Sequence, residues 1–158
     1  MNSMENIEYG HLIIALKDVL KKNVLKFTRQ REIVVQTLYN FPDHFSPEEL
    51  YILIKKNHPK LNIGIATVYR TLNLLENSGI ATSLSFGQAG KKFELANKPH
   101  HDHLICKNCG KILEFEDKEI EHKQEKIAKA NSFALTGHIM QLYGICEKCQ
   151  QKLKSENK

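Results

Sequence analysis

Apolar residues recur at helical spacing in four stretches of the N-terminal half. Residues 7–22 place leucine and isoleucine every three or four positions, with lysines elsewhere, which predicts an amphipathic helix. Thr28 is a candidate N-cap for a second helix. The Ser-Pro-Glu-Glu sequence at 46–49 predicts the start of a third, because a serine cap, a first-turn proline and a glutamate three residues after the serine form a capping box. A fourth helix is expected over 65–78, ending at Gly79.

Two short strands are expected after these helices, over residues 80–86 and 92–95, joined by the Gly-Gln-Ala-Gly loop at 87–90. Three helices followed by a hairpin are the layout of a winged helix-turn-helix, here preceded by one additional helix. The third and fourth helices would form the turn motif, and the fourth would enter the major groove of DNA.

Polar side chains on the fourth helix are of types that contact base edges, thymine methyls and phosphates. A lysine before the second helix could reach the minor groove, and the wing lysines Lys91 and Lys92 could contact phosphate. A solvated charged face would have the same composition, so DNA contact is a hypothesis at this point. The candidate DNA-binding residues are Lys26, Thr67, Tyr69 and Arg70.

A short polar segment at 96–99, closed by a proline, is the expected hinge. Beyond it, residues 103–106 and 112–115 read as strands, Asp117 caps a helix, and 133–145 alternates weakly as a third strand carrying His138. A polar tail is expected after Leu153. The predicted fold class is α+β, with a winged-helix domain over 1–95, a hinge over 96–99 and a small α/β domain over 100–158.

The four cysteines form two Cys-x-x-Cys pairs with 36 residues between them. Four thiolates are the usual ligand set of a closed tetrahedral zinc site, and Gly110 suits a tight turn after the first pair. A single pair would be read as a redox dithiol or as two buried thiols. Two pairs with no cysteine left over favour structural zinc. The expected ligands are Cys106, Cys109, Cys146 and Cys149.

The His-His-Asp-His run at 100–103 suggests metal binding of a second kind. In an extended chain its residues alternate between two faces, which separates His101 and His103 from His100 and Asp102. Imidazole with carboxylate suits first-row divalent ions, whereas four thiolates suit zinc. A solvated polar loop is the alternative. One expected site holds His101 and His103 with Glu94 and Glu114.

The composition is that of an ordinary globular chain, with 158 residues, 41% hydrophobic and 26% charged. No apolar run approaches the ~20 residues that span a bilayer, and the N-terminus does not resemble a secretory signal, so a cytoplasmic protein with metal-bound thiolates is expected. Residues 1–98 carry 13 lysines and arginines against 9 acids, and the whole chain has a net charge of +5. A basic N-terminal half permits binding to nucleic acid.

These motifs together resemble the ferric uptake regulator family of bacterial metal-dependent repressors. The matching segments are Gly-Ile-Ala-Thr-Val-Tyr-Arg at 64–70, Phe-Glu-Leu at 93–95, the histidine run with its Cys-x-x-Cys-Gly-Lys at 100–111, Glu-Phe at 114–115 and Cys-x-x-Cys at 146–149. The resemblance spans residues 24–149. It implies structural zinc on the four cysteines and two further metal sites. The regulatory site would hold His44, Glu94, His101, His103 and Glu114; an additional site would hold His100, Asp102, Glu121 and His138.

The resemblance implies a repressor of iron-uptake and iron-homeostasis genes that binds AT-rich inverted-repeat DNA operators as a homodimer or tetramer. Fe(II) would be the regulatory ion, with Mn(II) or Zn(II) able to substitute. Glu114 and the lack of a spare cysteine favour iron over peroxide, manganese or zinc sensing, which stay open. Rival hypotheses are a zinc hydrolase, a thiol-disulfide oxidoreductase and a metal-storage protein. We expect no enzyme activity, no small-molecule substrate and no membrane association.

Overall fold

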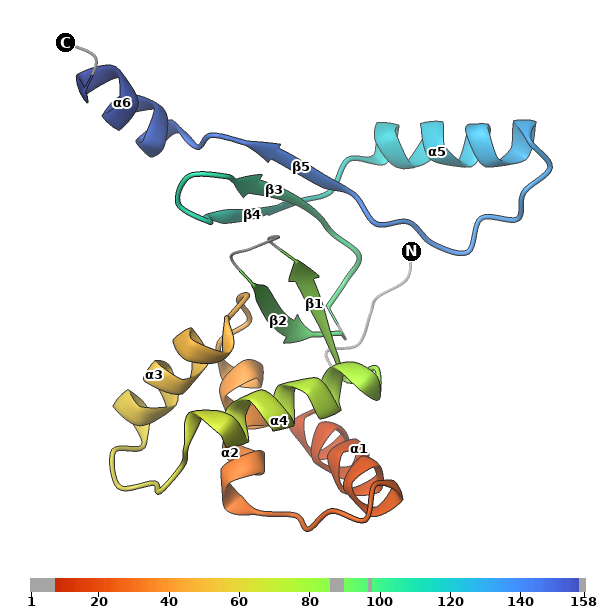
Figure 1. Cartoon of the computed structure of the whole chain (residues 1–158). Coiled ribbons are helices and arrows are strands. Elements are labelled where there is room, and N and C mark those ends of the chain that lie inside the picture. Colours follow the sequence, from red (N-terminus) through yellow and green to blue (C-terminus); the bar gives the residue numbers. More distant parts are fainter. Residues whose placement is uncertain (1–7, 86–89, 97, 157–158) are drawn as a thin grey trace. The chain divides into compact units, whose positions relative to one another are not determined.

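The computed structural model describes residues 8–85, 90–96 and 98–156 (Figure 1). The chain divides after Lys98 into two compact units. The first unit contains α1 (Tyr9–Lys22), α2 (Arg29–Asn40), α3 (Pro47–Asn57), α4 (Ile65–Asn77), β1 (Ala81–Ser85) and β2 (Lys91–Leu95). The second contains β3 (Asp102–Cys106), β4 (Ile112–Phe115), α5 (Lys118–Ala130), β5 (Gln141–Gly144) and α6 (Glu147–Glu156). The α+β fold class, a winged helix followed by a small α/β unit, is confirmed.

Helix α1 packs its apolar stripe into the first unit through Leu12, Leu16 and Leu20. It ends with the Leu25 N–H bonded to the Leu20 carbonyl at 2.8 Å and the Val24 N–H bonded to the Lys21 carbonyl at 3.1 Å. This is a Schellman-type end, which needs a left-handed residue. Val24 takes that position at φ 55°, where a β-branched side chain is strained.

The starts of α2 and α3 follow from their caps. The Thr28 hydroxyl accepts from the Arg31 N–H at the start of α2. At α3, the Ser46 hydroxyl accepts from the Glu49 N–H, while the Glu49 carboxylate accepts from the Ser46 N–H at 2.8 Å. This capping box satisfies two amide donors that a helix start leaves unpaired.

The wing is a two-stranded antiparallel hairpin in which Ala81 faces Leu95 and Ser85 faces Lys91. Figure 1 shows the four helices gathered on one side of it. The predicted end of the first wing strand at Phe86 and most of the loop at 87–90 lie outside the described residues. Phe45 bonds Phe93 through both backbone groups, at 3.0 and 2.8 Å. This short bridge holds the chain before α3 against β2.

The core of the first unit joins all four helices to the wing. Its buried residues include Leu16, Val34, Leu50, Leu72 and Phe93. Every helix therefore contributes at least one fully or nearly fully buried apolar side chain, and β2 closes the layer. Burial of this kind is the main favourable contribution to folding.

The second unit is a three-stranded sheet in the order β4-β3-β5, with β3 antiparallel to β4 and parallel to β5. The strand predicted over 133–145 is shorter than expected, because β5 pairs only opposite His103 to Cys106. His138 therefore precedes the strand. Helix α6 was not predicted from the sequence. Its only large apolar residue is Leu153, so the segment has no helical apolar period.

We expect Ser46→Ala to lower the free energy of unfolding of the first unit by about 1 kcal/mol, because the Glu49 N–H loses its partner. Urea unfolding followed by circular dichroism measures this. Ser85→Ala, at an exposed serine of β1, is the matched control. Equal effects of the two substitutions would contradict a specific role for the capping box.

Candidate metal centres and nucleic-acid interface

The four cysteine sulfurs converge in the second unit. Cys106 ends β3, Cys109 lies in the following turn, and Cys146 and Cys149 sit at the start of α6. Gly110 allows the turn at φ 71°. All four sulfurs lie within 4.8 Å of one another, and those of Cys109 and Cys146 are 3.7 Å apart. A tetrahedral zinc ion with Zn–S bonds of 2.3 Å separates its sulfurs by about 3.8 Å, so the cluster has the size of a zinc site.

The protonation of the cluster also indicates a cation. The backbone N–H of Cys146 donates to the Cys106 sulfur at 3.3 Å, and this contact, with the Cys109 N–H, lowers the Cys106 pKa to about 6. An Asn108 hydrogen bond favours the Cys149 thiolate, but burial and the three neighbouring thiols outweigh it and raise the Cys149 pKa to about 11. A bound cation would offset the raised pKa of Cys149 and favour its thiolate. The residues fit zinc.

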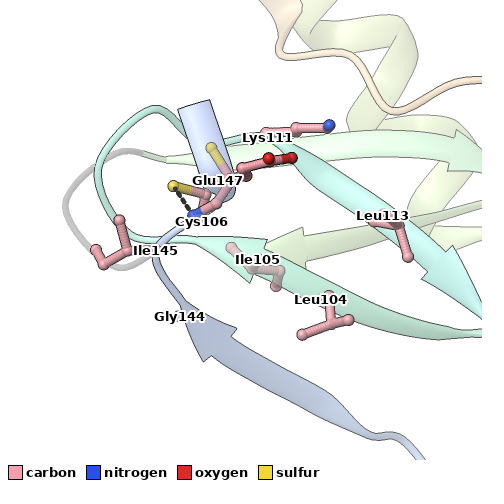
Figure 2. Close-up of a pocket in the computed structure, with 9 residues that line it drawn as sticks. Leu104, Ile105, Cys106, Lys111, Leu113, Gly144, Ile145 and Glu147 are labelled. Carbon is pink, nitrogen blue, oxygen red and sulfur yellow. Dashed lines mark hydrogen bonds between the residues drawn. The ribbon is translucent and has the colours of Figure 1, made fainter. Parts of the chain in front are cut away.

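An apolar hollow of about 360 Å³ adjoins the cysteine cluster. Figure 2 shows Leu104, Ile105 and Leu113 of β3 and β4 on its walls, with Ile145 beyond β5 and Cys106 beside it. Its polar lining residues are Lys111, Glu147 and the two cysteines Cys106 and Cys146. Apolar side chains make up most of the lining, which is typical of a packing surface and not of a substrate site.

A nitrogen and oxygen cluster lies in the same unit. Asp102 is 1% exposed, and its Oδ1 lies 3.3 Å from the His138 Nε2 and 3.6 Å from the His100 Nε2. That oxygen is buried without a hydrogen-bond partner among the described residues, an arrangement that a cation would relieve. Within the described part of the chain, the cluster contains His100, Asp102 and His138 but does not include Glu121.

The residues expected at the regulatory site form one group in each unit. In the first, His44 and Glu94 are next to the bridged residues Phe45 and Phe93, and the His44 Nε2 lies 3.2 Å from the Glu94 Oε1. In the second, the His101 and His103 rings are 4.7 Å apart. The His101 Nε2 is 3.8 Å from a Glu114 oxygen, and His103 pairs with Glu114 across the β3–β4 ladder.

Glu94 is held as a carboxylate. Burial would raise its pKa, but hydrogen bonds from His44 and Lys98 outweigh burial and lower the pKa to about 2. The Lys98 Nζ lies 2.8 Å from the second carboxylate oxygen. Lys98 was not predicted as a partner of Glu94, although the spacing of four residues between them is a signal in the sequence.

The candidate DNA-binding residues lie in the first unit. On α4, Tyr69 and Arg70 are exposed and Thr67 is half-buried, opposite the buried Val68 and Leu72. Lys26 is exposed in the turn before α2. The two wing lysines form ion pairs within the unit, and their contact with phosphate stays a prediction. Lys91 lies 2.9 Å from Glu76, and Lys92 lies 2.8 Å from Glu49.

Comparison with known proteins agrees with this geometry. Residues 22–143 match the ferric uptake regulator family. The chain belongs to this family. The ferric uptake regulation protein of Campylobacter jejuni is 59% identical over 152 residues, covering 96% of this chain and 97% of that protein.

Two solved structures of ferric uptake regulators support the assignment. The Helicobacter pylori ferric uptake regulator has a TM-score of 0.82 at 39% identity, covering 95% of this chain and 97% of that one. A ferric uptake regulator of Francisella tularensis, solved with iron, has a TM-score of 0.69 at 33% identity, covering 80% and 95%.

Membership of the ferric uptake regulator family makes this chain a metal-responsive transcriptional regulator. Members of the family are DNA-binding regulators, and DNA contact by the exposed face of α4 stays a prediction. The cysteine cluster fits the structural zinc that the sequence predicted. Among the described residues, no helix is long and apolar enough to cross a membrane.

We expect Cys109→Ser to lower bound zinc by about one ion per chain and to destabilise the second unit by several kcal/mol, because structural zinc contributes folding free energy directly. Metal analysis of the purified protein and thermal unfolding measure the two effects. Lys148→Ser, between Cys146 and Cys149, is the control. Full zinc content in Cys109→Ser would rule out the four-cysteine site.

Proposed function

We propose that this regulator responds to Fe(II) bound by His44, Glu94, His101, His103 and Glu114, and that it then represses iron-uptake and iron-homeostasis genes. The observation that carries the proposal is the grouping of these donors within each unit: His44 with Glu94 in the first, and His101 and His103 with Glu114 in the second. The Francisella tularensis relative solved with iron is a further support.

The donor set separates this proposed site from the zinc site. It contains only imidazole nitrogens and carboxylate oxygens, which suit iron and manganese, whereas the four sulfurs suit zinc. Affinity rises along the first-row series regardless of biological role, so Mn(II) and Zn(II) can substitute in solution. The competing proposals of manganese, zinc or peroxide sensing differ in which ion, or which oxidant, changes DNA affinity.

The proposed site draws on both units of the chain, with residues 96–99 between them as a hinge. One divalent ion would be coordinated by ligands from both units. His44 and Glu94 would thereby restrict the orientations that the winged helix samples, and only some orientations suit an operator. Since the two binding events are linked, DNA would tighten metal binding by the same factor by which metal tightens DNA binding.

A homodimer is the proposed assembly, with a tetramer as the alternative. Leu113, Leu104 and Leu142 lie side by side in neighbouring strands of the second unit. They form an exposed apolar stripe, with Leu104 42% exposed. Such a stripe is suited to cover by a second copy. A two-fold dimer would present two α4 helices to an inverted-repeat operator, AT-rich by family resemblance, in the cytoplasm.

The additional metal site proposed here contains His100, Asp102, Glu121 and His138. Three of its members are already clustered around the buried Asp102 oxygen. The Helicobacter pylori regulator has three functional metal-binding sites, which is the number proposed for this chain. No catalytic role is proposed for any of them.

We expect His101→Ala to weaken Fe(II)-dependent operator binding by more than about tenfold, because even supporting groups around a metal site cost that much. Anaerobic fluorescence anisotropy on an AT-rich inverted-repeat duplex, titrated with Fe(II), Mn(II) and Zn(II), measures it. His122→Ala, an exposed histidine of α5, is the control. Tight binding without any added regulatory ion would contradict the proposed sensor.

We expect Leu104→Lys to shift the protein from a dimer toward the 18.2 kDa monomer, since a charge would replace an apolar contact at the centre of the stripe. Light scattering after gel filtration reports the mass. Ile52→Lys, on the exposed face of α3, should leave the mass unchanged. An unaltered dimer in Leu104→Lys would place the dimer interface elsewhere.

A further inference from the structure

The exposed face of the helix-turn-helix contains an unexpected contact between its two helices. The Tyr69 hydroxyl of α4 donates a hydrogen bond to the Glu48 carboxylate, in the first turn of α3. This hydrogen bond is the main cause of a lowered pKa at Glu48 and a raised pKa at Tyr69. Tyr69 remains 41% exposed, so part of its side chain is accessible to a ligand.

The helix start does not require this contact. Ser46 and Glu49 already form the capping box of α3. A carboxylate near a helix N-terminus is mildly favourable through the helix dipole alone, with no need of a tyrosine. On a face that approaches DNA, however, a negative charge repels phosphates and lowers affinity. A contribution of Glu48 to base recognition would offset that loss of DNA affinity.

The chemistry of the pair restricts what Tyr69 can do. A phenol has one hydrogen to donate, and an ionised carboxylate can only accept. With that hydrogen directed to Glu48, the outward side of the Tyr69 oxygen offers lone pairs alone. In the major groove the hydrogen-bond donors are the adenine N6 and cytosine N4 amines, whereas thymine O4 and guanine O6 and N7 are acceptors.

We propose that Glu48 is a positioning residue for base recognition: it orients the Tyr69 hydroxyl so that Tyr69 accepts a hydrogen bond from an adenine or cytosine amine. This inference rests on the proposed binding of operator DNA by α4. Glu48 itself need not touch a base. Its influence passes through Tyr69, and Tyr69 is therefore the residue whose removal should abolish the effect.

A double-mutant cycle tests the proposal. Wild type, Glu48→Gln, Tyr69→Phe and the double variant are titrated, with Mn(II) present, against an AT-rich inverted-repeat duplex. The same titrations use duplexes in which each half-site position is replaced symmetrically by the other base pairs. Glutamine can donate its amide hydrogen to the tyrosine oxygen, which frees the hydroxyl to donate to a base.

We expect Glu48→Gln to shift the preference at one half-site position from adenine or cytosine toward thymine or guanine by about three- to tenfold. In the Tyr69→Phe background the same substitution should leave relative preferences unchanged. Glu48→Asp, which keeps the charge but shortens the side chain, should also weaken the wild-type preference. Asp18→Asn, an exposed acid of α1, controls for charge and should change affinity for all duplexes by one factor.

Zinc content should be unchanged in every variant, and thermal unfolding should change only slightly, because Asp18, Glu48 and Tyr69 are all exposed. The positioning role is wrong if Glu48→Gln changes the affinity for all duplexes by the same factor. It is also wrong if Glu48→Gln shifts base preference equally in wild type and in Tyr69→Phe. Either result would leave the proposed operator binding intact. If wild type binds none of the duplexes with any metal, the proposed operator binding and this inference are both overturned.

Discussion

The second unit depends on the four cysteine sulfurs, because apolar burial there is too small to hold it together. Among its described residues the only buried hydrophobic side chains are Ile105, Cys106 and Cys149, and α5 buries none. Units of about 60 residues commonly need metals, disulfides or a partner subunit for stability. A zinc ion on four thiolates and the proposed second copy over the leucine stripe would meet that need.

The first unit is built in the opposite way. Its helices and wing share one apolar core of buried leucine, isoleucine, valine and phenylalanine side chains, so its packing is built mainly from apolar burial. His44 and Glu94 are polar residues of this unit. They lie next to the residues of the Phe45–Phe93 backbone bridge, and Glu94 stays ionised despite burial. A rigid unit can then respond as a whole to an ion bound at a few of its residues.

Local signals made most of the fold predictable. Thr28, Ser46 and Gly79 mark helix ends by their own chemistry, and the cysteine spacing indicated the zinc site before any coordinates. The failures occurred where the information is not local. Helix α6 has no apolar period, and β5 is only as long as its partner allows. The ion pairs that hold Lys91 and Lys92 join residues 15 and 43 positions apart, which no sequence window contains.

The same limit applies to DNA recognition. From sequence, Tyr69 was expected to contact bases because of its type and its helical position, but its hydrogen-bonding role depends on Glu48, 21 residues earlier. A phenol alone can donate or accept, so residue type does not determine which base edge it prefers. The fold removes that ambiguity by bringing an acceptor-only group to one side of the hydroxyl. On the proposed role of Glu48, base preference in this helix-turn-helix would depend on α3 and α4 together.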